Sequence, residues 1–412
     1  MSVSAAWEIT EFRGPSGLAQ LEADWRRLYL ELPGRTCFHS FEAFKAYAAH
    51  RMERPDLLRC FRLSDGTRTR AICALEPRLE RRLGPPVRIW GVLAFHDHLA
   101  EFPCADAEAR RALAPALLAH LRRSREGRAL LALGPEPPDS ALWDPVLDRG
   151  GRCVEAVGTM CSMDCSMPYE KLLAGVRRHF RRDLALARNR LAPLAGVRYA
   201  VAREPAELEA AWRTYLEVEA AGWKGRARTA LLHRRGQSGF YADLIGSLRS
   251  GTDFCEIITL HAEERCLAAL LGVRTGSTYS AIKICYDEAY GRVSPGQLVL
   301  AKAVERCCAD PEVQRLDLVS DAYWLRGWRL DSVPLQRAFV DLGGCRGRML
   351  AALLRLRLGP LRRLARWAQD QASRWRQSRR AAKPAAPPRT NQANQASRAS
   401  QASQAPPVEE EA

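Results

Sequence analysis

The chain has 412 residues and a mass of 46.0 kDa, with 47% hydrophobic and 27% charged residues, so most of it can form packed cores in two or three domains. No apolar run reaches the roughly 18 residues that a membrane-spanning helix needs, which excludes an integral membrane protein. The first residues show neither a basic region nor an apolar stretch, so no secretory signal is expected and the protein is predicted to be cytoplasmic.

The net charge of +16 is concentrated near the C-terminus. Residues 346–412 hold 13 Arg and one Lys against four acidic residues, which amounts to +10 and leaves +6 for the first 345 residues. The larger part is only mildly basic, so no specific nucleic-acid partner is expected. The 13 cysteines form no Cys-x-x-Cys pair and have no His at zinc-finger spacing, which favours reduced thiols buried as small apolar side chains.

Residues 1–165 form the first predicted unit, in which helix and strand patterns alternate. Helices are expected over 18–31, over 41–50 with Ser40 as N-cap, and over 107–123. Strands are expected over 58–63 and 70–79, joined as a hairpin through Asp65-Gly66, and over 87–94. The segment Gly134-Pro-Glu-Pro-Pro138 then interrupts the pattern.

Residues 166–345 form the second predicted unit, with a comparable mixture of elements. One long basic helix is expected over 169–191, and further helices over 205–221 and from Ser294-Pro295-Gly296 to about 309. Strands are expected over 197–202, 313–319 and 335–341, and an antiparallel meander over 254–261, 266–274 and 278–286. The fold class is therefore α/β (α+β), with two tandem mixed-sheet units.

Two segments follow these units. Residues 346–376 combine arginines with leucines and tryptophans, with a break expected at Gly359-Pro360, and suit either a helix packed on the second unit or contact with an anionic membrane surface. Residues 377–412 are rich in Ala, Gln, Ser, Asn and Pro, so they are expected to form a disordered tail.

The stretch from Thr278 to Leu298 is the most specific chemical signal. A strand ends in the turn Tyr286-Asp287, and the chain enters a helix through Ser294-Pro295-Gly296. Ser294 can cap this helix, Pro295 suits its first position, and Gly296 lets a ligand approach the backbone. The positive end of such a helix favours an anion such as a phosphate, although a capped helix start without a ligand fits the same residues.

These motifs resemble the CelD/BcsL family, whose proteins carry a BioF2-like acetyltransferase domain of the GNAT superfamily. The meander, the Tyr286-Asp287 turn, the Ser294-Pro295-Gly296 entry and Asp317 on a later strand carry the resemblance. Also similar are Trp223-Lys224-Gly225, Phe240-Tyr241, and Trp25-x-x-Leu28 before Phe38-x-Ser40. The resemblance covers residues 15–340, most strongly 170–330. It implies two GNAT-like folds in tandem, as in FemAB-type proteins, and transfer of an acyl group, usually from acyl-CoA.

For such a transfer, a neutral amine attacks a thioester carbonyl, and the site needs a base, an oxyanion donor and a proton for the leaving thiolate. We expect residues 294–298 to bind the phosphates of the donor. The candidates in that segment are Ser294, Pro295, Gly296, Gln297 and Leu298. Asp287 or Glu256 is the candidate base, and Tyr286 or Tyr279 the candidate proton donor. A solvated turn for Asp287 and ordinary strand packing for both tyrosines are the alternatives.

Four further residues are candidates for substrate binding. They are Lys224, Lys283, Asp317 and Arg326, the last of which stands where the family resemblance leads us to expect Lys. Each also fits a structural role on the surface or in the sheet. His96-Asp97-His98 has residue types that bind metals, but no third ligand is indicated, so no metal is expected.

The first interpretation of function is therefore a GNAT-like acyltransferase that uses acyl-CoA and acts on an amine or hydroxyl of a small molecule or glycan precursor. The resemblance places it in exopolysaccharide, cellulose or cell-envelope synthesis. One alternative is a FemAB-like transferase that uses aminoacyl-tRNA. Another is a non-catalytic GNAT-derived scaffold of a polysaccharide-synthesis complex at the membrane.

Overall fold

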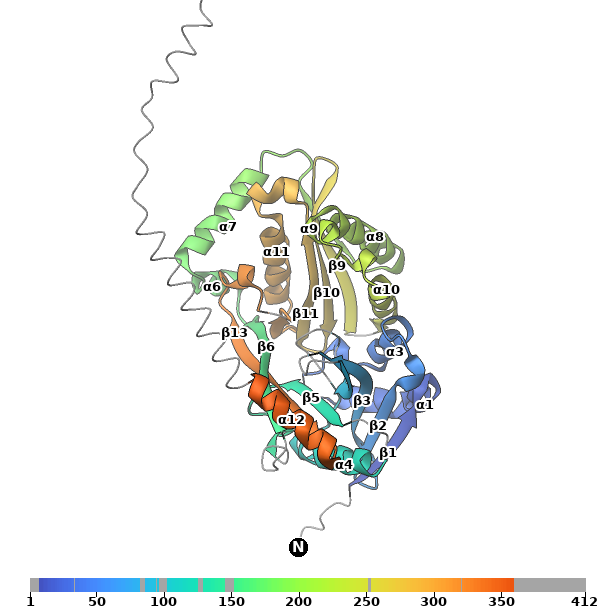
Figure 1. Cartoon of the computed structure of the whole chain (residues 1–412). Helices are drawn as coiled ribbons and strands as arrows, with labels where there is room; N and C mark the ends of the chain where they lie inside the picture. The colour runs from blue at the N-terminus through green and yellow to red at the C-terminus, as the bar shows by residue number, and fades with distance from the viewer. Residues whose placement is uncertain are drawn as a thin grey trace, which may run out of the picture. The chain divides into compact units, whose positions relative to one another are not determined.

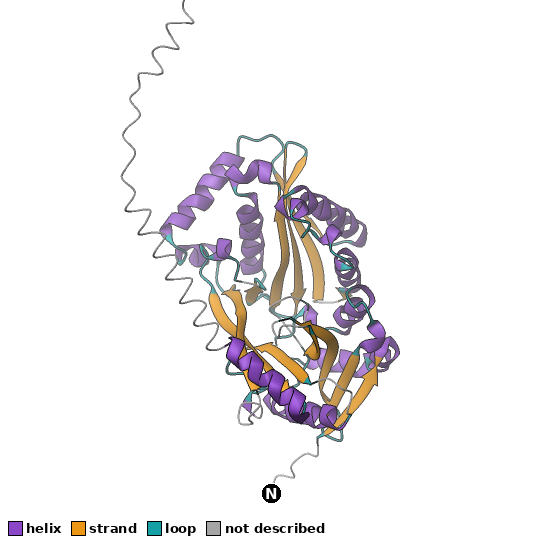
Figure 2. Ribbon diagram, in the orientation of Figure 1, coloured by secondary structure: helices purple, strands orange, loops and turns teal. Residues whose placement is uncertain are grey.

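The structure is a computed structural model that describes residues 7–32, 34–81, 86–93, 95, 102–124, 129–144, 152–250, 253–319 and 321–358. These residues are built on one mixed sheet with the strand order β1-β2-β3-β4-β5-β13-β6-β12-β11-β10-β9-β7, and β8 (Arg249–Ser250) pairs with β9. Helices cover both faces of the sheet (Figures 1 and 2). The expected mixed α/β fold is confirmed. The predicted tail, 377–412, lies outside the described residues.

The N-terminal part of the sheet follows the predicted order of elements. Its strands are β1 (Glu8–Arg13), β2 (Arg59–Ser64), β3 (Thr69–Glu80), β4 (Val87–Val92) and β5 (Leu130–Glu136). Its helices are α1 (Gly14–Gln20), α2 (Glu22–Glu31), α3 (Phe41–His50) and α4 (Ala107–Arg123). Strands β2 and β3 form the expected antiparallel hairpin, in which Gly66 has φ +89 and the Asp65 carboxylate accepts from the Thr67 and Arg68 amides.

Helix caps explain why two of these helices begin where the sequence predicts. Ser40 Oγ accepts the Ala43 amide at 3.2 Å, and Asp106 Oδ1 accepts the Ala109 amide at 2.9 Å. The prediction of one continuous helix over 18–31 is wrong, because α1 ends at Gln20 and α2 starts at Glu22. The Leu21 amide donates to the Leu18 carbonyl, which closes α1 with a tighter turn.

The C-terminal part contains the predicted meander. Its strands are β7 (Arg198–Ala202), β9 (Asp253–Ala262), β10 (Arg265–Thr275), β11 (Thr278–Tyr286) and β12 (Arg315–Asp317). Its helices are α6 (Tyr169–Ala174), α7 (Arg178–Leu191), α8 (Pro205–Ala221), α9 (Trp223–Arg226), α10 (Gln237–Ser247) and α11 (Pro295–Ala309). Short 3₁₀ helices are η1 (Cys37–His39), η2 (Pro55–Leu57), η3 (Leu231–His233), η4 (Glu288–Val293) and η5 (Tyr323–Leu325).

The single basic helix expected over 169–191 is corrected to two helices. Helix α6 ends at Ala174 and α7 starts at Arg178. The amide of the following residue, Gly175, donates back to the Lys171 and Leu172 carbonyls. An added Cβ on Gly175 would lie 3.1 Å from an Arg329 guanidinium nitrogen, so the break lets a neighbouring segment approach closely. Glycine also favours the break because it is a poor helix former.

Two long strands connect the N-terminal and C-terminal parts. β6 (Arg152–Asp164) pairs with β12 and with β13 (Asp331–Asp341), and β13 also pairs with β5. The sequence pattern predicts neither β5 nor β6. β5 runs through Gly134-Pro135, opposite an irregularity of β13 between Gln336 and Ala338 that accommodates the proline. The sheet is thus continuous through β13 and β6, and the boundary at residue 165 stays a prediction.

Alternate residues of the central strands define the two faces of the C-terminal part. Ile257 and Leu271 pack with α8 and α10, whereas Ile258 and Leu270 pack with α7 and α11. The first of these clusters also contains the α3 residue Phe44, so one apolar core joins both parts. Two helices on opposite faces, α8 and α11, therefore flank the same strands.

The last described element is α12 (Gly344–Leu358), which packs on β5, β6 and β13. It covers the first part of the predicted basic segment, whose residues 359–376 lie outside the described residues. Within the part of the chain that the structure describes, no helix is long and apolar enough to span a membrane. All 13 cysteines are free thiols, and ten of them are buried.

Candidate active site

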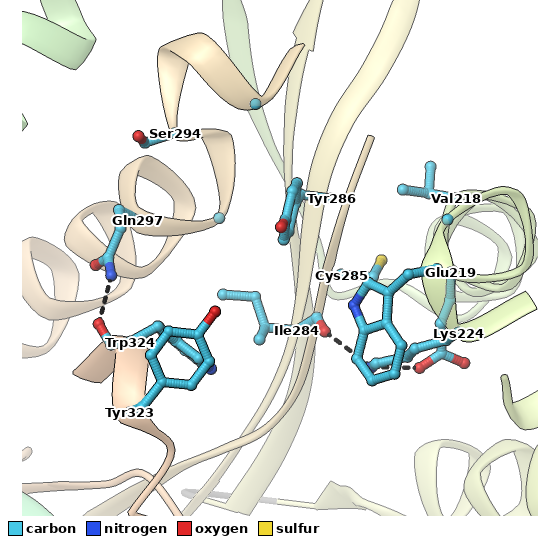
Figure 3. Close-up of a pocket in the computed structure, with 14 residues that line it drawn as sticks. Val218, Glu219, Lys224, Ile284, Cys285, Tyr286, Ser294, Gln297, Tyr323 and Trp324 are labelled. Carbon is cyan, nitrogen blue, oxygen red and sulfur yellow. Dashed lines mark hydrogen bonds and ion pairs between the residues drawn. The ribbon is translucent and has the colours of Figure 1, made fainter. Parts of the chain in front are cut away.

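A cavity of about 380 Å³ lies where β11 ends and α11 begins (Figure 3). Side chains from both faces of the sheet line it, with α8 and α9 on one side and η4, α11 and η5 on the other. Its lining residues are Val218, Glu219, Gly222, Trp223, Lys224, Ile284, Cys285, Tyr286, Gly291, Ser294, Gly296, Gln297, Tyr323 and Trp324. The cavity therefore passes the end of β11 from one face of the sheet to the other.

In the part of the chain that the structure describes, one edge of β11 is left without a strand partner at this point because β12 is short. β12 pairs with β11 only at Thr278, Tyr279 and Ser280, so the rest of that β11 edge has no strand partner among the described residues. The register between β10 and β11 shifts at Leu271/Gly272 and leaves Ile282 without an opposite residue. Such a bulge bends a strand and increases its twist. Among the described strands, residues 284–286 at the end of β11 pair with β10 on one edge only, and their other edge can line a cavity.

The start of α11 differs from the predicted serine cap. Ser294 has φ 49 and its side chain makes no cap hydrogen bond, so its predicted capping role is wrong. Its carbonyl instead accepts the amides of Gln297 and Leu298, at 3.0 and 3.2 Å. Pro295 lacks an N–H, so this helix start offers fewer open donors than its sequence suggests.

Gly296 is needed for close packing at the same helix start. A Cβ there would lie 3.3 Å from a ring carbon of Tyr286. The sequence predicts that a ligand approaches the backbone at Gly296. In the structure, the ring of Tyr286 occupies that side of Gly296 instead. Gly291 in η4 differs, since a Cβ at that position would meet nothing within 4 Å. Both glycines line the cavity, but only Gly291 has room for a larger side chain.

Gln297 holds η5 against α11. Its Nε2 donates to the Trp324 carbonyl at 2.7 Å (Figure 3). Its Oε1 accepts from the Trp328 indole at 3.0 Å. Tyr323 and Trp324 are thereby kept beside the cavity. Leu298 turns away into the core, where its side chain is 1% exposed.

On the opposite side, Glu219 and Lys224 form an ion pair that faces the cavity. Lys224 Nζ lies 2.7 Å from Glu219 Oε1 and 3.4 Å from the Ile284 carbonyl oxygen (Figure 3). Glu219 Oε2 also accepts the Leu231 amide at 2.8 Å, and only 3% of its side chain is exposed. Sequence reasoning placed Lys224 among the candidates but did not select Glu219. The available signal was an acidic residue at the end of the apolar stripe of α8.

The backbone around Lys224 is compact. A Cβ on Gly225 would come within 1.7 Å of the Ala220 carbonyl oxygen, so only glycine fits after Lys224. Glu288 of η4 accepts the Trp223 amide at 2.7 Å and pairs with Arg226. The hydrogen bond from Arg226, followed by that from the Trp223 amide, lowers the pKa of Glu288 below its usual value. These contacts tie α9 to η4 across the cavity.

Two of the predicted catalytic residues lie in a different pocket. Tyr279 donates to Glu256 Oε1 at 2.9 Å, and Arg203 and Arg306 pair with Glu256 Oε2. Burial and then the Glu256 charge raise the pKa of Tyr279 well above its usual value. Tyr279 and Tyr286 are seven residues apart on one strand, or about 23 Å at 3.3 Å per residue. The structure therefore does not bring Glu256 and Tyr279 to the cavity at the α11 start.

The remaining candidates lie outside the cavity lining. Asp287 caps η4 by accepting the Ala289 amide, and Lys283 lies 5.5 Å from the Tyr241 ring centre, toward α10. Asp317 is buried, lies 3.6 Å from Arg315 and accepts the Val319 amide. Arg326 is exposed at the end of η5.

The metal motif cannot be placed, because His96, Asp97 and His98 lie outside the described residues. Within the described ranges, no group of three or more metal-ligating side chains is found.

Comparisons with known proteins find a matching domain family and several similar solved structures. Residues 178–325 match the family model of the acetyltransferase (GNAT) domain. No curated protein matches the sequence. The solved structure of FemX is similar with a TM-score of 0.54 and 10% identity, over 77% of this chain and 95% of that chain.

Two further solved structures are similar to this chain. One is a domain of a putative lysylphosphatidylglycerol synthetase from Agrobacterium fabrum, with a TM-score of 0.51 and 12% identity over 81% of this chain and 94% of that one. The other is L-PGS from Bacillus licheniformis, with a TM-score of 0.50 and 14% identity over 84% of this chain and 98% of that one. The described chain thus has the fold of these structures, and its residues 178–325 match the GNAT acetyltransferase domain.

Proposed function

We propose that the protein is an N- or O-acyltransferase in which acyl-CoA enters the cavity from the α11 side and an amine or hydroxyl acceptor enters from the α8–α9 side. One observation carries the proposal: side chains from both faces of the sheet line a single cavity past the free end of β11. Because donor and acceptor must meet with their reacting atoms in line, a passage with two entrances suits transfer between two substrates.

The donor side combines a helix start with an open strand edge. The positive end of α11 and the space beside Gly291 suit an anionic group such as a pyrophosphate. The unpaired edge of β11 offers backbone N–H and C=O groups to the amides of a pantetheine-like arm. The GNAT match over 178–325 supports the same donor class.

The reacting end contains Lys224. Two of its three ammonium protons point to Glu219 and to the Ile284 carbonyl, which leaves one for a substrate oxygen. In the transfer, the acceptor nitrogen or oxygen attacks the thioester carbon, and negative charge develops on the carbonyl oxygen. Lys224 stabilises this charge, and Glu219 keeps Lys224 in place.

Collapse of the intermediate breaks the C–S bond. Tyr286, whose ring lines the cavity, supplies a proton to the leaving thiolate. The acceptor loses its proton to water, and water in turn restores the proton of Tyr286.

Calorimetry with acetyl-CoA tests the donor assignment. Wild type is expected to bind, and Gly291→Trp to bind at least about tenfold more weakly, because the new ring fills open space without a backbone clash. Gly291→Ala is the control at the same position and should bind like wild type. Equal binding by wild type and Gly291→Trp would rule out this cavity as the donor site.

An aminoacyl-tRNA donor is the second candidate, and one feature favours it. Arg178, Arg181 and Arg182 are exposed on α7, the helix next to α11, and suit a phosphate backbone. Retained tRNA together with an absence of acyl-CoA binding would select this donor. If the protein binds neither tRNA nor acyl-CoA and transfers no group to any amine, the non-catalytic scaffold would be the remaining candidate.

Trp223 and Lys224 line the side of the cavity that we assign to the acceptor. The resemblance of Trp223-Lys224-Gly225 to the CelD/BcsL family supports an amine or hydroxyl of an exopolysaccharide, cellulose or cell-envelope precursor. Release of CoA thiol with a panel of amino sugars, as opposed to amino acids, tests this choice.

A further inference from the structure

The outer face of α12 carries exposed apolar residues that no part of the described chain covers. Met349 is 56%, Leu353 40% and Leu356 52% exposed. Their spacing of i, i+4 and i+7 places them in one stripe along the helix. Scattered apolar residues on a surface are ordinary, but an aligned stripe on one helix indicates a binding surface.

The opposite face of α12 fixes the helix to the sheet. Leu350, Ala351 and Leu354 are buried there against β5, β6 and β13. Gly347 permits this close packing, since a Cβ would lie 2.8 Å from the Ala129 carbonyl oxygen. Because the inner face is packed against the sheet, the stripe of Met349, Leu353 and Leu356 lies on the surface of the folded protein.

Arginines flank the stripe on both sides. At 100° per residue, Arg346 and Arg357 lie on one side of the stripe and Arg348 and Arg355 on the other. All four are exposed, and α12 contains no acidic residue. An apolar stripe bordered by cations suits a surface with anionic headgroups above an apolar layer.

We propose that the outer face of α12 docks on an anionic lipid bilayer. Met349, Leu353 and Leu356 enter the boundary of the acyl region, and the flanking arginines contact lipid phosphates. This inference does not depend on the acyltransferase proposal, because α12 contributes no residue to the cavity lining.

Two other occupants fit the stripe less well. Residues 361–380 carry seven Arg against one Asp, so the arginines of α12 repel that segment, whereas an anionic bilayer attracts both. A second copy of the chain would present the same arginines. Three exposed apolar side chains are also too few for a stable homodimer, which buries about 800 Å² on each partner.

Co-flotation of the full chain with vesicles tests the proposal. Wild type is expected to float with vesicles of phosphatidylcholine and phosphatidylglycerol, and not with phosphatidylcholine alone. The variant Leu353→Ser/Leu356→Ser should lower the partition coefficient roughly tenfold. Both leucines are exposed, so the melting temperature should stay near that of wild type, which separates lost docking from lost folding.

Two controls locate the effect. Leu30→Ser removes an exposed leucine of α2, 66% exposed, and should float like wild type. Arg178→Gln/Arg181→Gln removes two exposed positive charges from α7, away from the stripe, and should keep most of the binding.

Three results would overturn the proposal. They are absence of wild-type flotation with the anionic vesicles, undiminished flotation of the Leu353→Ser/Leu356→Ser variant, and light scattering that shows a wild-type dimer which this variant dissociates. The last would assign the stripe to self-association.

Discussion

Replacing Lys224 distinguishes the chemical role of the Glu219–Lys224 pair from its structural role. Lys224→Met leaves Glu219 buried without its cation, which is expected to lower the free energy of unfolding by about 3 kcal/mol. The same change removes the donor that we assign to the developing oxyanion, so kcat/KM should fall about 100-fold. Urea unfolding and a CoA-release assay measure the two effects.

The double variant Lys224→Met/Glu219→Gln is the control. Removing the unpaired charge should recover most of the stability, but activity should stay low. Recovery of activity together with stability would show that the pair is structural, and would remove Lys224 from the proposed chemistry.

Substitutions of Gly225, in α9, and Gly291, in η4, are expected to differ in their effect on stability. Gly225→Ala places a Cβ 1.7 Å from the Ala220 carbonyl oxygen, so it should destabilise the protein by about 3 kcal/mol. Gly291→Ala meets no atom within 4 Å and should change stability by less than about 0.5 kcal/mol. Thermal unfolding of both variants checks the difference; similar melting temperatures would contradict the packing of α9 on α8.

The sequence alone indicates part of this site. Lys224, Tyr286, Ser294 and Gln297 were candidates from motifs, and the structure brings them to one cavity. The sequence does not indicate Glu219 as a site residue. Its role depends on its partners, Lys224 and the Leu231 amide, which only the structure reveals. Glu256 lies on β9 and Tyr279 at the start of β11, so both line a different pocket from Tyr286, which ends that strand.

At the scale of elements, the link between α9 and η4 should depend on pH. The pKa of Glu288 in the folded protein is below its usual value of 4.5, mainly because Arg226 donates a hydrogen bond to it. The link is therefore present above about pH 4.5 and is lost as the pH falls through the lower, folded-state pKa. A fluorinated tryptophan at Trp223 should report this transition by NMR, and Glu288→Gln should abolish it. A pH-independent Trp223 signal in wild type would contradict the link.

Element boundaries were predictable where a local signal defined them. The helices over 41–50 and 205–221 begin at Ser40 and at Pro205, and both signals act within one turn. Strand β6 was not predicted, because its pairing with β12 and β13 depends on residues more than 150 positions away. The break between α6 and α7 coincides with Gly175, a local signal that the apolar spacing over 169–191 outweighs in the sequence pattern.

At the level of the whole molecule, β13 joins the N-terminal and C-terminal parts of the described sheet. It pairs with β5 and β6, so we expect one cooperative transition rather than two. Phe339→Ala removes a ring that is 1% exposed and should lower stability by about 4 kcal/mol in that single transition. Val154→Ala, at an exposed position opposite Ala338, is the control with a small effect. Separate transitions by circular dichroism and tryptophan fluorescence would contradict this cooperativity.

In the proposed mechanism, donor and acceptor meet in the cavity beside the end of β11. A crystal structure of the protein with acetyl-CoA would show where the donor binds. We expect the pyrophosphate near the start of α11 and Gly291, and the thioester carbonyl between residues 284–286 and the Lys224 ammonium. Acetyl-CoA bound at any other place, or an empty cavity at a saturating concentration, would contradict this mechanism.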